Sequence, residues 1–150
     1  MKNSASLKKS IPAAVQRAYK DAVKTRQAAY APYSKFKVGS ALVAKGGKIF
    51  SGCNVENCNW GGSVCAERNA IIHSVAEGYR EFTDIVVVTD AAEPAFPCGF
   101  CLQVMAEFFE PETRVLIGNL RGIVSMHPFI ELNPKPFGPR QLAQAGKTKK

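Results

Sequence analysis

Hydrophobic residues recur at helical spacing over the first part of the chain. They lie at Val15, Ala18, Tyr19, Ala22, Val23 and Tyr30. Residues three, four or seven positions apart share one face of a helix, so this pattern predicts a helix that runs up to Pro32. Ser10 can cap its N-terminus, with Pro12 in the first turn, where a missing N–H costs little.

Two short strands are predicted to follow as an antiparallel hairpin. The runs Val38–Ala44 and Lys48–Val55 are rich in apolar residues and are joined through Gly46-Gly47. Two glycines tolerate the positive φ angles of a tight hairpin turn.

The rest of the chain alternates between helical and strand patterns. We expect helices from near Cys65 to Gly78 and over Cys98–Glu110, and strands over Asp84–Thr89, Arg114–Gly118 and Ile123–His127. The continuous β-branched run at 84–89 is typical of a strand covered on both faces. An irregular tail is expected after the last strand.

This order of elements predicts an α/β fold, a three-layer α/β/α sandwich with a mixed five-stranded sheet. The length suits one domain, residues 1–150, with about 1–10 and 143–150 as flexible ends. Both cysteine-bearing helices begin just after strands or loops. We therefore expect the cysteines to gather at one edge of the sheet, where ligand sites of open α/β sheets collect.

Composition excludes several classes of protein. Apolar residues make up 46% of the chain and charged residues 21%, which argues against a disordered or collagen-like chain. No apolar run approaches the roughly 18–20 residues that span a bilayer. Pro12 and Gln16 interrupt any signal-like apolar stretch near the N-terminus, so we expect a cytoplasmic protein.

The formal charge of +8 comes from 20 basic and 12 acidic residues. Seven basic residues lie in the first 26 positions against the single Asp21, and three lysines lie in the last four positions. Charge placed at the ends favours a solvated surface over a nucleic-acid site.

The five cysteines are more informative than the charge. An odd count without a secretory signal argues for a reducing compartment. Cys98 and Cys101 are spaced so that two sulfurs at a helix start reach one ion, and the free N–H groups there stabilise thiolates. A redox dithiol and two buried cysteines are the alternatives for this pair.

A third cysteine and a carboxylate favour the metal. Cys65 supplies a third ligand, and Glu67 lies two residues on, where it can exchange protons with water at an open metal position. Alone, Glu67 would be interpreted as a first-turn acid that complements the helix dipole. A ligand-x-Glu followed by Pro-Cys-x-x-Cys, however, is the pattern of zinc deaminases.

From about Ala29 to Leu142 the sequence resembles the cytidine deaminase family, specifically its small three-cysteine nucleoside enzymes. The matching segments are Ala31-Pro32-Tyr33-Ser34-Lys35-Phe36, Gly52-Cys53-Asn54-Val55-Glu56-Asn57, Cys65-Ala66-Glu67-Arg68, Pro97-Cys98-Gly99-Phe100-Cys101, Gln103-Val104 and Phe137-Gly138-Pro139. Several ordered motifs over most of the chain are more specific than any one of them.

The resemblance implies hydrolytic deamination of cytidine and deoxycytidine in pyrimidine salvage. Cys65, Cys98 and Cys101 would hold one Zn²⁺ per subunit, and Glu67 would move protons while water attacks C4 of the pyrimidine. Arg68 matches a family position from which a cation compensates the negative charge of the thiolates.

The same resemblance implies the substrate contacts and the assembly. Asn54 and Glu56 would bind the ribose hydroxyls, Phe36 would pack against the base, and the Ala66 backbone would meet the base edge. Phe137 lies in the tail segment by which a family homotetramer completes a neighbour's site.

Two residues depart from the family pattern. Leu102 stands where the family usually has arginine, which indicates added core packing or weaker charge compensation. Trp60 stands where tyrosine is common, so this wall of the substrate pocket differs. Of the other candidate ligands, we expect Cys53 and Cys58 to be incidental thiols; His73 and His127 are expected to be structural.

Three alternative functions follow from the same residues: a deaminase of a related cytosine nucleoside or nucleoside antibiotic, a polynucleotide cytosine deaminase, and a non-catalytic zinc module. Glu56 would repel a phosphate, which argues against nucleic acid as a substrate. A closed zinc module would need a fourth protein ligand.

Overall fold

The computed structural model describes residues 11–93 and 95–145, and its centre is a mixed five-stranded sheet. The strands are β1 (Gly39–Ala44), β2 (Ile49–Cys53), β3 (Phe82–Thr89), β4 (Arg114–Asn119) and β5 (Gly122–Pro128). Their order across the sheet is β2-β1-β3-β4-β5. The pairing of β3 with β4 is parallel and the other three pairings are antiparallel. The predicted mixed sheet is confirmed.

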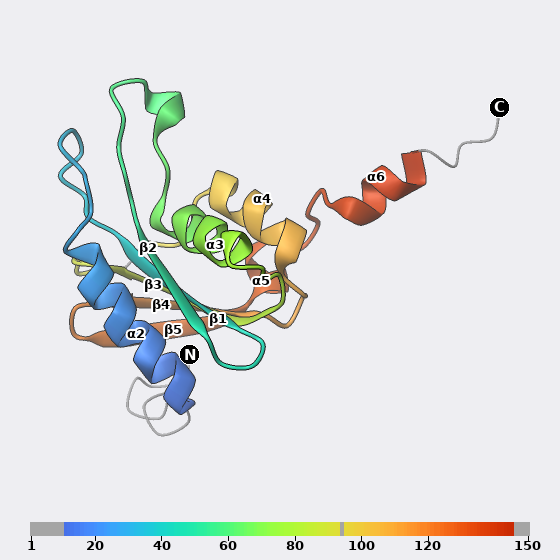
Figure 1. Cartoon of the computed structure of the whole chain (residues 1–150), viewed down its shortest axis with the longest axis horizontal. Helices are drawn as coiled ribbons and strands as arrows, with labels where there is room; N and C mark the ends of the chain where they lie inside the picture. The colour runs from blue at the N-terminus through green and yellow to red at the C-terminus, as the bar shows by residue number, and fades with distance from the viewer. Residues whose placement is uncertain (1–10, 94, 146–150) are drawn as a thin grey trace.

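Helices cover both faces of this sheet (Figure 1). Helix α2 (Ala13–Arg26) covers one face, while α3 (Ala66–Ala76) and α4 (Gly99–Phe108) cover the other. Successive side chains of a strand point to opposite faces. Thus Val86 and Val88 of β3 join the core under α2, whereas Ile85 and Val87 join the core under α3 and α4. The three-layer α/β/α prediction is confirmed.

The hairpin of β1 and β2 has the predicted turn. Gly46 and Gly47 adopt φ angles of 99° and 90°, a left-handed region that side chains with a Cβ rarely occupy. The register pairs Gly39 with Cys53 and Val43 with Ile49.

The first helix is shorter than predicted. It ends at Arg26, and Pro12 occupies the position just before it instead of a place within its first turn; Ser10 lies outside the described residues. Tyr30 instead forms an isolated bridge with Val55, in which its N–H donates to Asn54 O at 3.0 Å and its carbonyl accepts from Glu56 N at 2.8 Å. Pairing with this segment requires extended backbone, which a continuing helix could not supply.

The tail after β5 is also more regular than expected. It contains the short helices α5 (Phe129–Leu132) and α6 (Pro139–Ala145). Elsewhere in the chain, the 3-10 turn η1 (Trp60–Gly62) lies between β2 and α3. Phe129 is buried against the core, whereas α6 extends away from the body of the molecule (Figure 1). Residues 143–145, which the sequence places in a flexible end, belong to α6; residues 1–10 and 146–150 lie outside the described residues.

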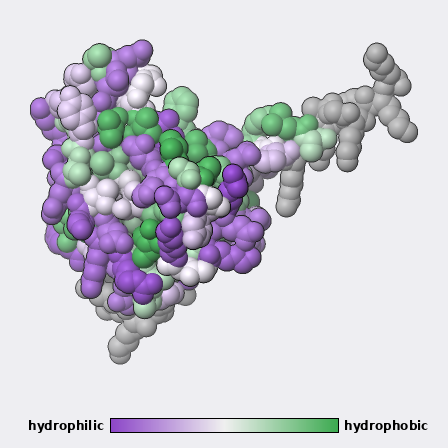
Figure 2. Space-filling view, viewed as in Figure 1, coloured by the Kyte–Doolittle hydropathy of each residue, from purple (hydrophilic) through white to green (hydrophobic). Residues whose placement is uncertain are grey.

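Apolar residues gather at the base of α6 in the space-filling view (Figure 2). Leu142 of α6 is 62% exposed. Among the described residues, no helix combines the length and apolar character needed to cross a membrane.

Candidate metal centre and active site

Three cysteines meet where two helices begin. Cys65 is the extended residue that precedes α3, Cys98 holds the same position before α4, and Cys101 lies in the first turn of α4. The Sγ atoms of Cys65 and Cys98 are 3.9 Å apart, and those of Cys98 and Cys101 are 3.6 Å apart. All three lie within 4.8 Å of one another. The structure thus brings together the three sulfurs that the sequence assigned to one ion.

This donor set fits zinc. Tetrahedral zinc with bonds of about 2.3 Å to sulfur places neighbouring sulfurs about 3.8 Å apart, close to the two separations given above. Free N–H groups at the two helix starts favour thiolates. Residues 11–93 and 95–145 add no fourth His, Cys, Asp or Glu to the group, so the arrangement leaves one coordination position open, as catalytic zinc sites do.

Glu67 lies in the first turn of α3, two residues after Cys65, and is 5% exposed. Burial raises the pKa of its carboxyl to about 7, because the charged form loses its hydration. A carboxyl group that titrates near neutral pH can both accept and donate a proton. An acid that only complements the helix dipole would be solvated, whereas Glu67 is buried in the first turn of α3.

Arg68 lies beside the same thiols. Its Nη2 donates to Ser63 O at 2.8 Å, and its guanidinium carbon is 5.9 Å from the centre of the Phe100 ring. Hydrogen bonding from Cys101, followed by Arg68, lowers the pKa of the Cys65 thiol to about 5. The same Cys65–Cys101 hydrogen bond and burial raise the pKa of Cys101. The hydrogen bond thus shifts the pKa values of Cys65 and Cys101 in opposite directions.

Asn54 and Glu56 both contact the segment that carries Phe36. Asn54 Nδ2 donates to Phe36 O at 2.9 Å, while its Oδ1 accepts from Val38 N at 2.8 Å. One carboxylate oxygen of Glu56 accepts from Tyr33 N at 2.9 Å and from Ser34 N at 3.2 Å, and the other accepts from the Ser34 hydroxyl. Asn54 and Glu56 therefore hold the backbone of residues 33–38 in place.

The remaining predicted contact residues have different surroundings. Trp60 is 71% exposed in η1 and its ring centre lies 5.9 Å from that of Tyr33. The Ala66 side chain is buried. Phe137 is exposed, and its carbonyl accepts from Gln103 Nε2 at 2.7 Å, which fastens the tail to α4.

The other thiols and the histidines lie outside the metal group. Cys53 ends β2, and Cys58 is exposed in the loop before η1. The ring of His73 packs edge-on against Phe50, and His127 lies 3.4 Å from Glu131. Leu102 packs against the core beneath α4, which supports the packing interpretation of this departure.

One residue of the basic N-terminal group departs from the predicted solvated surface, on which Arg17, Lys20 and Lys24 are exposed. Arg26 belongs to the basic N-terminal group that the sequence assigned to solvated surface, but its side chain is only 11% exposed and pairs with Asp90 at 2.5 Å. Neither Arg26 nor Asp90 was a candidate site residue, and the sequence carries no local signal for their contact, because 64 positions separate them. Ser34, whose hydroxyl contacts Glu56, lies in one of the matching motifs but was not predicted as a site residue.

Comparisons with known proteins agree with this geometry. Residues 12–117 match the model of the cytidine and deoxycytidylate deaminase zinc-binding region. A cytidine deaminase of Halalkalibacterium halodurans is 44% identical over 118 residues, which cover 79% of this chain and 89% of that protein. A cytidine deaminase of Sporosarcina psychrophila is 40% identical over 131 residues, covering 87% and 96%.

Solved structures agree as well. The crystal structure of a cytidine deaminase from Burkholderia pseudomallei has a TM-score of 0.77 and 44% identity, covering 81% of this chain and 98% of that one. The cytidine deaminase of Mycobacterium leprae has a TM-score of 0.70 and 31% identity, covering 81% and 98%. Because the family model matches residues 12–117 and these relatives match most of the length, the chain belongs to the cytidine and deoxycytidylate deaminase family.

Proposed function

We propose that the protein is a zinc-dependent enzyme that hydrolyses cytidine and deoxycytidine to uridine and deoxyuridine with release of ammonia. One observation carries the proposal: a group of three thiols with an open ligand position lies two residues from a buried carboxyl group. Pyrimidine salvage is the metabolic role that this reaction serves.

Cys65, Cys98 and Cys101 would hold the zinc, which lowers the pKa of bound water towards neutrality and so supplies a nucleophile. Glu67 takes a proton from the attacking water and delivers it to ring N3 as the water oxygen bonds to C4. It then takes the remaining proton from the hydroxyl group now on C4 and passes it to the exocyclic nitrogen, which leaves as ammonia as the C4–N bond breaks and the C4 carbonyl forms. A pKa near 7 suits a group that must both accept and give a proton.

Sugar recognition falls to Asn54 and Glu56. Hydrogen bonding from Ser34 lowers the pKa of Glu56, so its carboxylate stays ionised at neutral pH and accepts from hydroxyl groups. The same negative charge repels a phosphate, which favours a nucleoside over a nucleotide. Phe36, the Ala66 backbone and Trp60 would line the space for the base.

A homotetramer is the assembly that we propose, with Phe137 reaching a neighbouring subunit's site. The exposed Phe137, the extended α6 and the apolar residues at its base support this assignment (Figure 2). A cytoplasmic location and the absence of a nucleic-acid role complete the proposal.

The central test is an ultraviolet assay of purified, zinc-loaded protein with cytidine, deoxycytidine, CMP and cytosine. Conversion of both nucleosides, weak use of CMP and cytosine, and loss of activity after chelation are expected. Preference for CMP would contradict the role of Glu56. Salt-dependent binding of single-stranded DNA without turnover of cytidine would favour the polynucleotide alternative.

Glu67→Gln tests the proton transfers. The amide keeps the size of the side chain but cannot carry the proton, so we expect unchanged zinc content and a loss of turnover of about 10²–10⁴-fold. Glu77→Gln, at the end of the same helix and paired with Lys48 at the surface, is the matched control and is expected to retain activity. Substantial turnover by Glu67→Gln would refute the assignment.

A further inference from the structure

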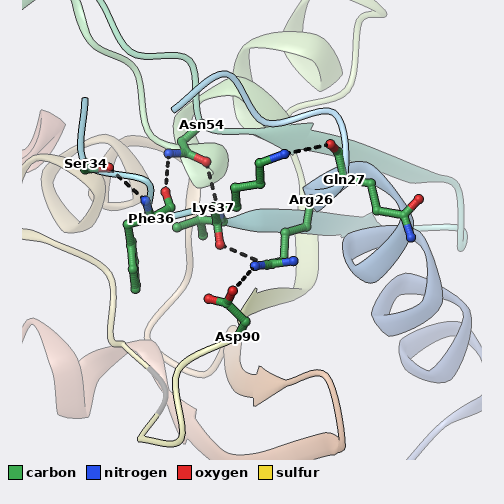
Figure 3. A network of polar contacts seen from close by, with 8 residues as sticks. Arg26, Gln27, Ser34, Phe36, Lys37, Asn54 and Asp90 are labelled. Carbon is green, nitrogen blue, oxygen red and sulfur yellow. Dashed lines mark hydrogen bonds and ion pairs between the residues drawn. The ribbon is translucent and has the colours of Figure 1, made fainter. Parts of the chain in front are cut away.

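Arg26, the last residue of α2, joins three parts of the chain (Figure 3). Its Nη2 lies 2.5 Å from Asp90 Oδ2, and its Nε donates to Lys37 O at 2.9 Å. A guanidinium can hold two acceptors at once because its donors project in a fixed planar fork. The Arg26 side chain is nearly buried at 11% exposed, whereas its partner Asp90 is half-exposed.

The peptide group that Arg26 holds is also held by Asn54. Lys37 O and Val38 N belong to one peptide unit, and Val38 N donates to Asn54 Oδ1 at 2.8 Å. Hydrogen bonds on the two ends of one amide polarise each other. Arg26 and Asn54 are therefore linked through a single rigid group, as Figure 3 shows.

The segment that they hold adopts a strained conformation. Lys35 has a φ of 60°, in the left-handed region that residues other than glycine seldom occupy. Such a conformation persists only when its surroundings fix it. Ser34 fixes one side through Glu56 and through the Phe36 N–H, which donates to Ser34 Oγ at 3.0 Å. Arg26 and Asn54 fix the other side.

We propose that Arg26 is a positioning residue for nucleoside binding, held in place by Asp90 and acting through the Lys37–Val38 peptide on Asn54 and Phe36. This proposal rests on the sugar and base contacts of the proposed function. Arg26 touches none of the reacting groups. Its loss is expected to weaken binding of the nucleoside while leaving the chemical step largely intact.

Steady-state kinetics on zinc-loaded enzyme test this role. For Arg26→Gln we expect KM for cytidine to rise about tenfold, equivalent to about 1.4 kcal/mol, with kcat within about twofold of the wild type. Titration with uridine is expected to show the same weakening without any turnover. Arg26→Lys retains the charge but lacks the fork, so it is expected to restore only part of the affinity.

A double-mutant cycle separates positioning from general stability. If Arg26 acts through Asn54 and the neighbouring Phe36, the double variant with Asn54→Ala binds the nucleoside less weakly than the sum of the two single effects predicts. Lys45→Gln is the matched control, because it removes the 2.9 Å ion pair with Glu81 at the far end of β1 and is expected to leave KM unchanged. Asp90→Asn covers the case in which Arg26→Gln does not fold. Because Asp90 is half-exposed, we expect this variant to fold and to show a smaller rise in KM.

The outcomes distinguish the two proposals. An active wild type with unchanged KM in Arg26→Gln and Asp90→Asn, or with additive effects of Arg26→Gln and Asn54→Ala, overturns the role of Arg26 alone. A wild type that neither converts cytidine nor binds uridine overturns the proposed function, and the role of Arg26 with it.

Discussion

At the scale of single residues, we expect charge balance to govern the acidity of the zinc-bound water. Three thiolates on Zn²⁺ leave a net charge of −1, which makes bound water less acidic than it is at a site with neutral ligands. Hydrogen bonding from Cys101 is the main cause that lowers the pKa of the Cys65 thiol, and Arg68 adds to it, so we propose that Arg68 opposes this charge. Leu102, where the family resemblance implies arginine, packs against the core and adds no second cation.

Arg68→Gln is therefore expected to slow turnover severely. Loss of a partner that supports metal ligands typically costs about 10–100-fold in activity or metal affinity. We expect kcat to fall within this range while zinc content, measured by atomic absorption, stays unchanged. Arg80→Gln, at an exposed position beyond the end of α3, is the control. Near-normal kcat in Arg68→Gln would show that the helix starts alone compensate the thiolates.

The sequence predicts the residues that meet at the metal centre better than the contacts around Arg26. Cys65, Glu67, Cys98 and Cys101 form short motifs, because a helix start brings residues two or three positions apart to one point. Arg26, Lys37 and Asp90 meet only after α2, the 33–38 segment and the end of β3 have been packed together. Such contacts have no fixed spacing, so pattern analysis cannot find them.

At the scale of elements, two glycines set how closely the helices approach the hairpin. A Cβ on Gly39 of β1 would lie 2.0 Å from Ala22 O of α2, and a Cβ on Gly52 of β2 would lie 2.5 Å from Ala70 N of α3. Both neighbours are backbone atoms of helices and cannot move aside as a flexible side chain would. The absence of a side chain at these two positions thus fixes the spacing of the layers.

Gly39→Ala and Gly52→Ala are each expected to destabilise the fold. Forcing a methyl group into packed structure typically costs about 1–3 kcal/mol, and in a chain of this length each kcal/mol lowers Tm by about 2–4 °C. Gly99→Ala is the control, because its Cβ meets nothing within 4 Å in the first turn of α4. Thermal unfolding followed by circular dichroism measures the difference. Equal Tm values for all three variants would contradict the close-packing argument.

Periodicity identified the strands and the two metal-bearing helices but misplaced the end of the first helix. Tyr30 satisfies the helical spacing, yet its backbone pairs with the segment after β2. Hydrophobic spacing indicates which side chains are buried. It does not show that the Tyr30 backbone bonds to Asn54 and Glu56, more than 20 positions away, instead of continuing the helix. The helical tail was missed for a related reason, since α5 and α6 are too short to show a period.

At the scale of the whole molecule, the C-terminal arm bears on whether the site is complete within one chain. Gln103 fastens the Phe137 carbonyl to α4, and α6 then extends away from the body (Figure 1). The exposed Phe137 ring and the exposed Leu142 of α6 suit contact with a second subunit. Symmetric assembly would place each arm against an equivalent neighbour.

Subunit mixing tests whether Phe137 acts in the neighbouring chain. Glu67→Gln and Phe137→Ala are each expected to have low activity on their own. In mixed assemblies made by co-expression, a chain with intact Glu67 can receive Phe137 from a Glu67→Gln neighbour. With equal, random mixing, half of the sites have an intact Glu67, and half of those have a neighbour with an intact Phe137. Roughly a quarter of wild-type activity is therefore expected to return. Pairing Glu67→Gln with the double variant restores nothing, because both chains lack Glu67, and this mixture is the control.

Failure of the first mixture to recover activity would place Phe137 in its own chain's site, and a monomer in sedimentation equilibrium would overturn the tetramer.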